Sequence, residues 1–130
     1  MTRHPWDERL YLANAAVLLV HQMDAVHWQE WHLFGLAGGL PLFLALNLPL
    51  VGLVVAGYGA LSTRRRSGQA FAWALAGSGA FAVVFHAHHL LAGDARFRAS
   101  ASLALLTATA FLSSAQALRL ARARAGDAAA

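Results

Sequence analysis

Residues 70–92 read AFAWALAGSGAFAVVFHAHHLLA, an apolar run without a single aspartate, glutamate, lysine or arginine. A membrane-spanning helix needs about 20 predominantly apolar residues, and this run is long enough. Three further apolar runs occupy about residues 10–28, 40–61 and 100–118. The sequence therefore predicts an all-α fold, an integral membrane four-helix bundle that forms one domain over residues 1–130.

The composition of the chain agrees with a membrane protein. The 130 residues are 58% hydrophobic and 12% charged, and the mean hydropathy is +0.50. Soluble domains carry about 25% charged residues, so this chain has too few to cover a soluble surface. Its ten basic residues are all arginines outside the apolar runs and form no basic face, so we expect no nucleic-acid partner. The absence of cysteine excludes disulfides and thiolate metal ligands.

The distribution of arginine predicts the orientation in the bilayer. With four spans, one side of the membrane receives eight arginines and the other side receives two. The larger group consists of Arg3, Arg9, Arg64, Arg65, Arg66, Arg119, Arg122 and Arg124, and the smaller group of Arg96 and Arg98. Positively charged loops face the cytoplasm, so we expect a multi-pass protein with both termini cytoplasmic. A homo-oligomer or a membrane partner protein stays open.

Two histidine motifs lie inside the first and third apolar runs. His21 and Asp24 belong to LLVHQMDAVHW, and His86 and His89 belong to FAVVFHAHHLLAG. Ionisable side chains cost about 2.5–3.5 kcal/mol each on membrane-insertion scales, so a chain that carries them is expected to use them. Residues three positions apart share a helix face. The sequence therefore predicts a metal site near the outer face with His21, Asp24, His86 and His89 as ligands, a set that suits zinc or iron.

Two further residues are candidates for catalysis beside such a metal. Glu30 and His27 follow the first motif closely, near the outer end of its helix. Either side chain could relay a proton from a metal-bound water or act as a general base. The leading hypothesis is therefore a metal-binding membrane protein, with an activity on a lipid or a small hydrophobic substrate left open.

Two other functions account for the same residues. In a haem-b electron carrier, His21 would face His86 or His89 as the second axial ligand across the bundle. In a non-catalytic membrane subunit, the polar layer would hold the helices in register or carry protons. His21 and Asp24 would then be a hydrogen-bonded polar pair that holds the helices together. The sequence does not decide whether the protein is an enzyme.

Residues 10–48 carry a His-x-x-Asp motif, then Trp-x-Glu-Trp, Gly-Gly and a Leu-rich span with asparagine. This order resembles an uncharacterised family of small four-helix bacterial membrane proteins, which implies the bacterial inner (plasma) membrane as location and names no reaction. The matching positions are His21, Asp24, Trp28, Glu30, Trp31, Gly38, Gly39 and Asn47. The chain is also loosely similar to membrane proteins with a His-x-x-Glu-Glu motif. Asp24 and Ala25 replace the two glutamates here, which excludes a ligand at position 25.

Overall fold

The computed structural model describes residues 5–128, which contain four long α-helices, two short 3-10 helices and no strand. In chain order these elements are α1 (Pro5–His27), η1 (Glu30–His32), α2 (Gly39–Ser62), α3 (Gly68–Leu91), η2 (Ala95–Arg98) and α4 (Ser100–Ala128). The predicted all-α bundle is thereby confirmed. Arg3, which was counted for the orientation, lies outside the described residues.

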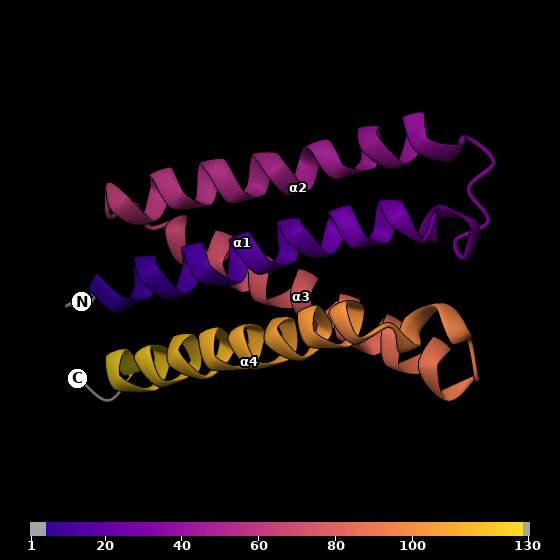
Figure 1. Cartoon of the computed structure of the whole chain (residues 1–130). Coiled ribbons are helices and arrows are strands. Elements are labelled where there is room, and N and C mark those ends of the chain that lie inside the picture. Colours follow the sequence, from indigo (N-terminus) through magenta and orange to yellow (C-terminus); the bar gives the residue numbers. More distant parts are fainter. Residues whose placement is uncertain (1–4, 129–130) are drawn as a thin grey trace.

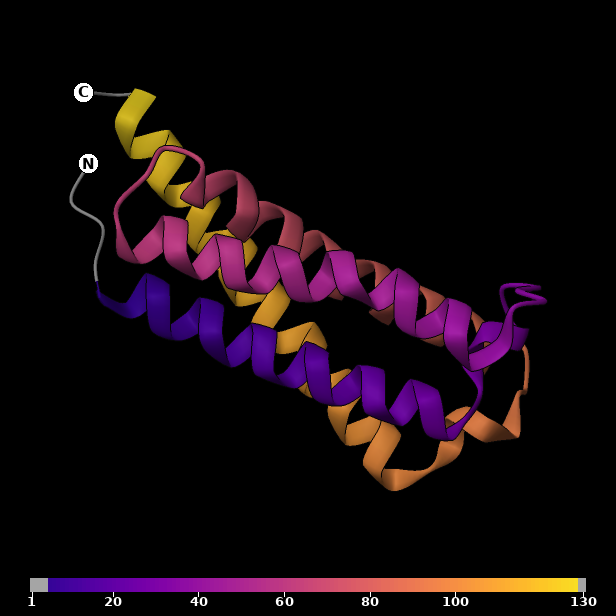
Figure 2. The ribbon, with the colours of Figure 1, turned by 90° about the horizontal axis from the view of Figure 1, so that it is seen from above.

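The helices run up and down, so consecutive helices are antiparallel (Figure 1). The α1–α2 and α3–α4 junctions lie at one end of the bundle, and the α2–α3 connection lies at the other (Figures 1 and 2). Among the described residues, α1 packs against all three other long helices, whereas α2 and α4 do not touch. Helices α1 and α3 are therefore the inner diagonal of the bundle, and α2 is the most loosely covered helix.

Three helices are long and apolar enough to cross a membrane, namely α2, α3 and α4 as far as Gly126. Helix α2 is the most apolar, and only 6% of its apolar window is buried inside the bundle. Its exposed side chains include Leu44 and Leu48, as expected for a helix that faces lipid. Helix α1 is not among these three, and polar residues such as Asn14, His21 and Asp24 interrupt its apolar run. A fourth membrane crossing by α1 therefore stays a prediction.

The first and last helices extend beyond their predicted ends. Helix α1 begins at Pro5 rather than near residue 10, since proline is well suited to the first turn of a helix. Helix α4 continues to Ala128 rather than ending near residue 118, because this segment is rich in alanine and arginine, both strong helix formers. The Arg119 guanidinium also donates to the Asp7 carboxylate at 2.9 Å, which joins the end of α4 to the start of α1.

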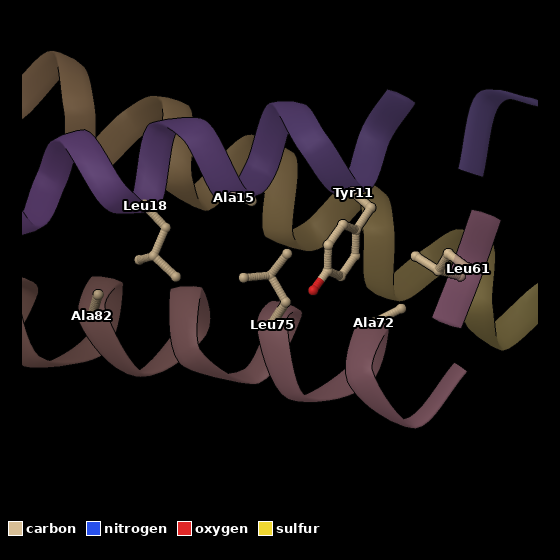
Figure 3. Packing of buried hydrophobic residues seen from close by; sticks show 7 residues of the cluster. All are labelled: Tyr11, Ala15, Leu18, Leu61, Ala72, Leu75 and Ala82. Atoms are coloured by element: carbon tan, nitrogen blue, oxygen red, sulfur yellow. The ribbon is translucent and has the colours of Figure 1, made fainter. Parts of the chain in front are cut away.

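The apolar core lies between α1 and α3 (Figure 3). Tyr11, Ala15 and Leu18 of α1 point toward α3, with spacings of four and three residues that keep them on one face. The other members of the cluster are Leu61, Ala72, Leu75 and Ala82. The alanines in this core allow the two helices to approach closely, as small residues do between membrane helices.

Tyr11 also connects the core to α2. Its hydroxyl donates to the carbonyl oxygens of Leu53 at 2.9 Å and Val54 at 3.2 Å. A β-carbon at Gly57 would collide with this hydroxyl, so the glycine leaves the space that the tyrosine needs. This contact fastens the second half of α2 to α1, while the first half of α2 borders the site described below.

Candidate metal centre

Three ionisable side chains from three different elements meet near the junction end of the bundle. His21 of α1, Glu30 of η1 and His86 of α3 are 3%, 4% and 4% exposed. Each offers one potential ligand atom, and these atoms all lie within 4.8 Å of one another. The two imidazole rings are 4.6 Å apart between centroids and inclined by 70°. We call these three residues the His–Glu cluster.

The local structure after α1 explains how Glu30 enters the cluster. Gln29 adopts the left-handed conformation with φ 53°, which is uncommon for a residue other than glycine, and the chain turns into η1. Trp31 is then buried against Phe43 of α2 and close to Ala25. Successive residues of a 3-10 helix point about 120° apart. With Trp31 held against α2, its neighbour Glu30 is directed toward α3.

His86 is held by a hydrogen bond at each ring nitrogen. Its Nδ1 lies 2.8 Å from the carbonyl oxygen of Ala82, one turn earlier in α3. A carbonyl only accepts hydrogen bonds, so Nδ1 carries the hydrogen and donates it. The other nitrogen, Nε2, lies 2.8 Å from Oε1 of Glu30. In a neutral ring this Nε2 holds a lone pair, and an ionised carboxylate is also only an acceptor. The contact therefore requires either a proton or a cation at these two atoms.

This arrangement resembles the way in which proteins prepare histidine for metal binding. A hydrogen bond from one ring nitrogen to a backbone carbonyl fixes the tautomer and aims the other nitrogen at the metal. The Ala82 carbonyl holds His86 in that way, with Nε2 directed at the His–Glu cluster. His86 is therefore already oriented as a ligand.

His21 supplies an independent sign of an incomplete site. Its Nδ1 is buried and has no hydrogen-bond partner among the described residues. Leaving a buried polar atom unpaired costs about 1–3 kcal/mol. A cation shared with Glu30 and His86 would satisfy this atom and would also resolve the contact between two acceptors.

The cluster borders an open cavity of about 660 Å³ that is lined by α1, α2, α3 and the α1–α2 junction. Small-molecule sites typically have volumes of about 300–1,000 Å³ and mostly apolar walls. Apart from the cluster and Gln22, Asn47 and Ser78, the lining is formed by Leu18, Phe34, Leu36, Phe43, Leu46, Leu50, Gly77, Phe81, Ala82 and Phe85. The site therefore consists of one polar region on an otherwise apolar chamber.

Aromatic rings surround the cluster and the mouth of the cavity. Phe34 stacks on Phe85 with 4.4 Å between centroids and 10° between planes. On another side, the buried Phe97 of η2 meets His86 edge-on at 4.7 Å. These rings shield the cluster from water, which strengthens electrostatic interactions inside it.

The structure brings together some, but not all, of the residues singled out in the sequence. His21 and His86 lie in the cluster, and the carboxylate beside them comes from Glu30, which was expected to be catalytic. Asp24 is half-buried in α1 and lies outside the group of potential ligands. His89 is half-buried among the rings of Phe85 and Phe97 and also lies outside it. Ligand roles for Asp24 and His89 stay predictions without support from this arrangement.

His27, the second catalytic candidate, lies away from the cavity. Its side chain is exposed and contacts the ring of Trp28, and it does not line the chamber. Trp28 in turn donates its indole N–H to Ser102 of α4 at 3.2 Å. The described structure therefore places His27 at the surface of the junction end, where a role in proton transfer stays a prediction.

A second buried polar group lies closer to the opposite end of the bundle and was not anticipated from the sequence. Asn14 of α1 donates to Oε1 of Gln116 at 3.0 Å and accepts from the Ser113 hydroxyl at 3.1 Å. Gln116 donates in turn to the carbonyl oxygen of Ala72 in α3 at 2.6 Å. We call these four residues the amide network. Ser113 and Gln116 share a face of α4 by their spacing of three, which is the signal that could have indicated it.

The sequence model of a family described as a family of unknown function (DUF6713) matches residues 7–123. No curated protein gives a significant match to the chain, and no solved structure does. The expected resemblance to an uncharacterised family is confirmed at this level. The motif that was quoted for it and the bacterial origin stay expectations.

Proposed function

The chain belongs to this family of unknown function. We propose that it is a membrane protein with a metal site formed by His21, Glu30 and His86. The observation that carries the proposal is the set of three buried ligand atoms within 4.8 Å. His21 also has a buried Nδ1 without a hydrogen-bond partner among the described residues. The membrane location is supported by the three helices that are long and apolar enough to cross a bilayer.

Zinc or iron fits this set of donors best. Two imidazoles and one carboxylate occur in catalytic zinc sites and in non-haem iron sites, where further coordination positions stay open. Ligand atoms of a tetrahedral zinc ion lie roughly 3.4 Å apart. His86 Nε2 and Glu30 Oε1, now 2.8 Å apart, would separate slightly and the His21 ring would move in.

The open side of the cluster faces the apolar cavity, which favours an enzyme that acts on a lipid or a small hydrophobic substrate. A bound metal would supply a polarised oxygen or an activated water at that point. His21, Glu30 and His86 would hold the ion, and the rings of Phe85 and Phe97 would exclude bulk water from it. Glu30 would then act as a ligand, so its proposed role as a catalytic base requires a carboxylate oxygen that the ion leaves free.

We further propose the bacterial inner membrane as the location, with both termini in the cytoplasm. The α2–α3 connection with Arg64, Arg65 and Arg66 lies at the opposite end of the bundle from the α1–α2 junction that carries Glu30 (Figure 1). With this orientation, which the positive-inside rule favours, the metal site would lie near the outer face. Reporter fusions to the α2–α3 connection test this orientation.

Metal analysis tests the central proposal. The protein would be purified in mild detergent without a histidine tag, alongside a His21→Ala, His86→Ala double variant and a His88→Ala control. His88 is exposed and next to the cluster in sequence but outside it. We expect about one zinc or iron per chain in the wild type and control, and none in the double variant. Wild-type protein that neither contains nor takes up zinc or iron would refute the proposal.

One observation favours a second candidate, a proton-handling membrane subunit. The 2.8 Å contact between His86 and Glu30 could hold a shared proton instead of a metal. The same purification distinguishes the two, since a metal-free protein whose Glu30→Gln variant alters proton uptake supports this candidate. The haem alternative with His21 and His86 as axial ligands gains no support. Their rings touch edge-to-face at 4.6 Å between centroids, which leaves no room for a porphyrin.

A further inference from the structure

The residues that line the cavity follow α2 and α3 over several turns. On α3 its lining residues extend from His86 back to Gly77, a length of about 13 Å at 1.5 Å per residue. On α2 they extend from Phe43 to Leu50, which is about 10 Å by the same rule. The His–Glu cluster occupies one end of this length, and beyond it the walls are apolar apart from Asn47 and Ser78.

The wall between α2 and α3 is open to the outside of the bundle. Leu46 of α2 and Phe81 of α3 both line the cavity, yet they are 55% and 62% exposed. Helix α2 packs on the core between α1 and α3 through Leu50, Leu53 and Val54, all in or near its second half. At its start, Phe43 packs on Trp31. The first half of α2 therefore borders the chamber without closing it, and the opening faces the lipid side of an apolar helix.

The cavity shape and its polar end together define a ligand. We propose that the chamber binds one unbranched alkyl chain along α3, taken from the bilayer between α2 and α3, with its oxygen-bearing head group at the His–Glu cluster. An extended apolar chain fits the length of the cavity and its apolar walls. An oxygen atom of the head group could bind at the side of the His–Glu cluster that faces the cavity. The contact of the head group rests on the proposed metal site, whereas binding of the chain rests on the cavity alone.

Two glycines provide a matched pair of variants. Gly77 lines the cavity, and a β-carbon there would meet no atom within 4 Å, so Gly77→Phe is designed to add a ring at the cavity wall. Gly52 of α2 has equally free space around it but does not line the cavity, so Gly52→Phe is the control. Dodecanoic acid is the probe, and its retention by the intact protein in detergent is measured by native mass spectrometry.

We expect the wild type and Gly52→Phe to retain one dodecanoic acid, and Gly77→Phe to bind it at least about tenfold more weakly. A second pair guards against misfolding of one variant. Leu46→Trp narrows the opening, while Leu48→Trp places the same side chain on a residue of α2 that is 69% exposed and outside the cavity lining. Equal binding by Gly77→Phe and the wild type, with Leu46→Trp also unchanged, would overturn the proposal.

Metal content measured on the same samples separates this inference from the proposed function. Wild-type protein that holds zinc but no dodecanoic acid refutes the ligand and leaves the metal site intact. Protein without metal that still binds the probe, and loses it in Gly77→Phe, upholds the chain site while the metal proposal fails. Dodecane bound as tightly as dodecanoic acid to zinc-loaded protein would refute the contact of the head group with the cluster.

Discussion

The amide network and the His–Glu cluster are both buried and both connect α1 with α3, yet they differ in how far their polar atoms are satisfied. Asn14 and Gln116 each use the nitrogen and the oxygen of the side-chain amide in hydrogen bonds. His21 keeps an unpartnered nitrogen, and His86 directs a lone pair at a carboxylate unless a proton or cation intervenes. A satisfied polar group holds helices in register, whereas an unsatisfied one beside a cavity indicates a ligand.

The largest expected effect tests whether the cluster is a metal site. Glu30→Gln replaces the carboxylate by a neutral amide, and we expect zinc affinity to fall about 100-fold or more while the helix content stays unchanged. Competition with a chelator measures the affinity, and circular dichroism measures the helix content. The control is Glu8→Gln at the start of α1, far from the cluster in sequence. Unchanged zinc affinity in Glu30→Gln would show that the His–Glu cluster, like the amide network, is not a metal site.

The next prediction concerns the amide network. Gln116→Leu leaves the Asn14 amide without its acceptor in an apolar interior, and we expect a loss of about 1–2 kcal/mol in the free energy of unfolding. Denaturation in mixed micelles measures this loss, with Ser114→Leu on the exposed side of α4 as the control. Metal content should not change. A Gln116→Leu variant that keeps its stability but loses metal would contradict this expectation, because the amide network would then affect the metal site rather than the stability of the bundle.

Acidification should affect only one of the two groups. Histidine must be unprotonated to bind a metal, so we expect the ion to leave as the pH falls from about 7.5 to about 5. The amides of Asn14 and Gln116 do not titrate in this range, and the bundle should stay folded. Metal analysis after dialysis measures the bound ion, and the helix content measures whether the bundle stays folded. Release of metal only upon unfolding would contradict the expectation.

The smallest effect is expected at Asp24. This residue was predicted as a ligand, but its carboxylate lies outside the cluster, so Asp24→Asn should lower zinc affinity by less than about tenfold. If Asp24 were a direct ligand, Asp24→Asn would lower zinc affinity as much as Glu30→Gln does. Chelator competition on both variants in parallel decides between the four-ligand set from the sequence and the three-ligand set from the structure.

The sequence was a good guide to the helices because hydropathy is a local property. Each of the four apolar runs coincides with one long helix, and the deviations occur at Pro5 and in the alanine-rich segment after residue 118. His21 and His86 were also identified locally, since each lies on an inward helix face. Membrane crossing by α1 stays a prediction, because Asn14, His21 and Asp24 interrupt its apolar run.

The carboxylate of the cluster could not be assigned from the sequence for a physical reason. Spacing along one helix favours Asp24 as the partner of His21, whereas Glu30 reaches the cluster only through the left-handed turn at Gln29 and the packing of Trp31 on Phe43. Both depend on contacts between elements. The same applies to the amide network, in which Asn14 and Gln116 are 102 positions apart.

The 56 positions between Glu30 and His86 have a consequence for the order of biosynthesis. Helix α1 and η1 leave the ribosome long before the residue that completes the cluster, and until α3 has entered the bundle no second imidazole faces Glu30. Any ion that needs all three side chains can bind only after that step. Metal loading would therefore be a late event in the maturation of this protein, and an α1–α2 fragment should capture none.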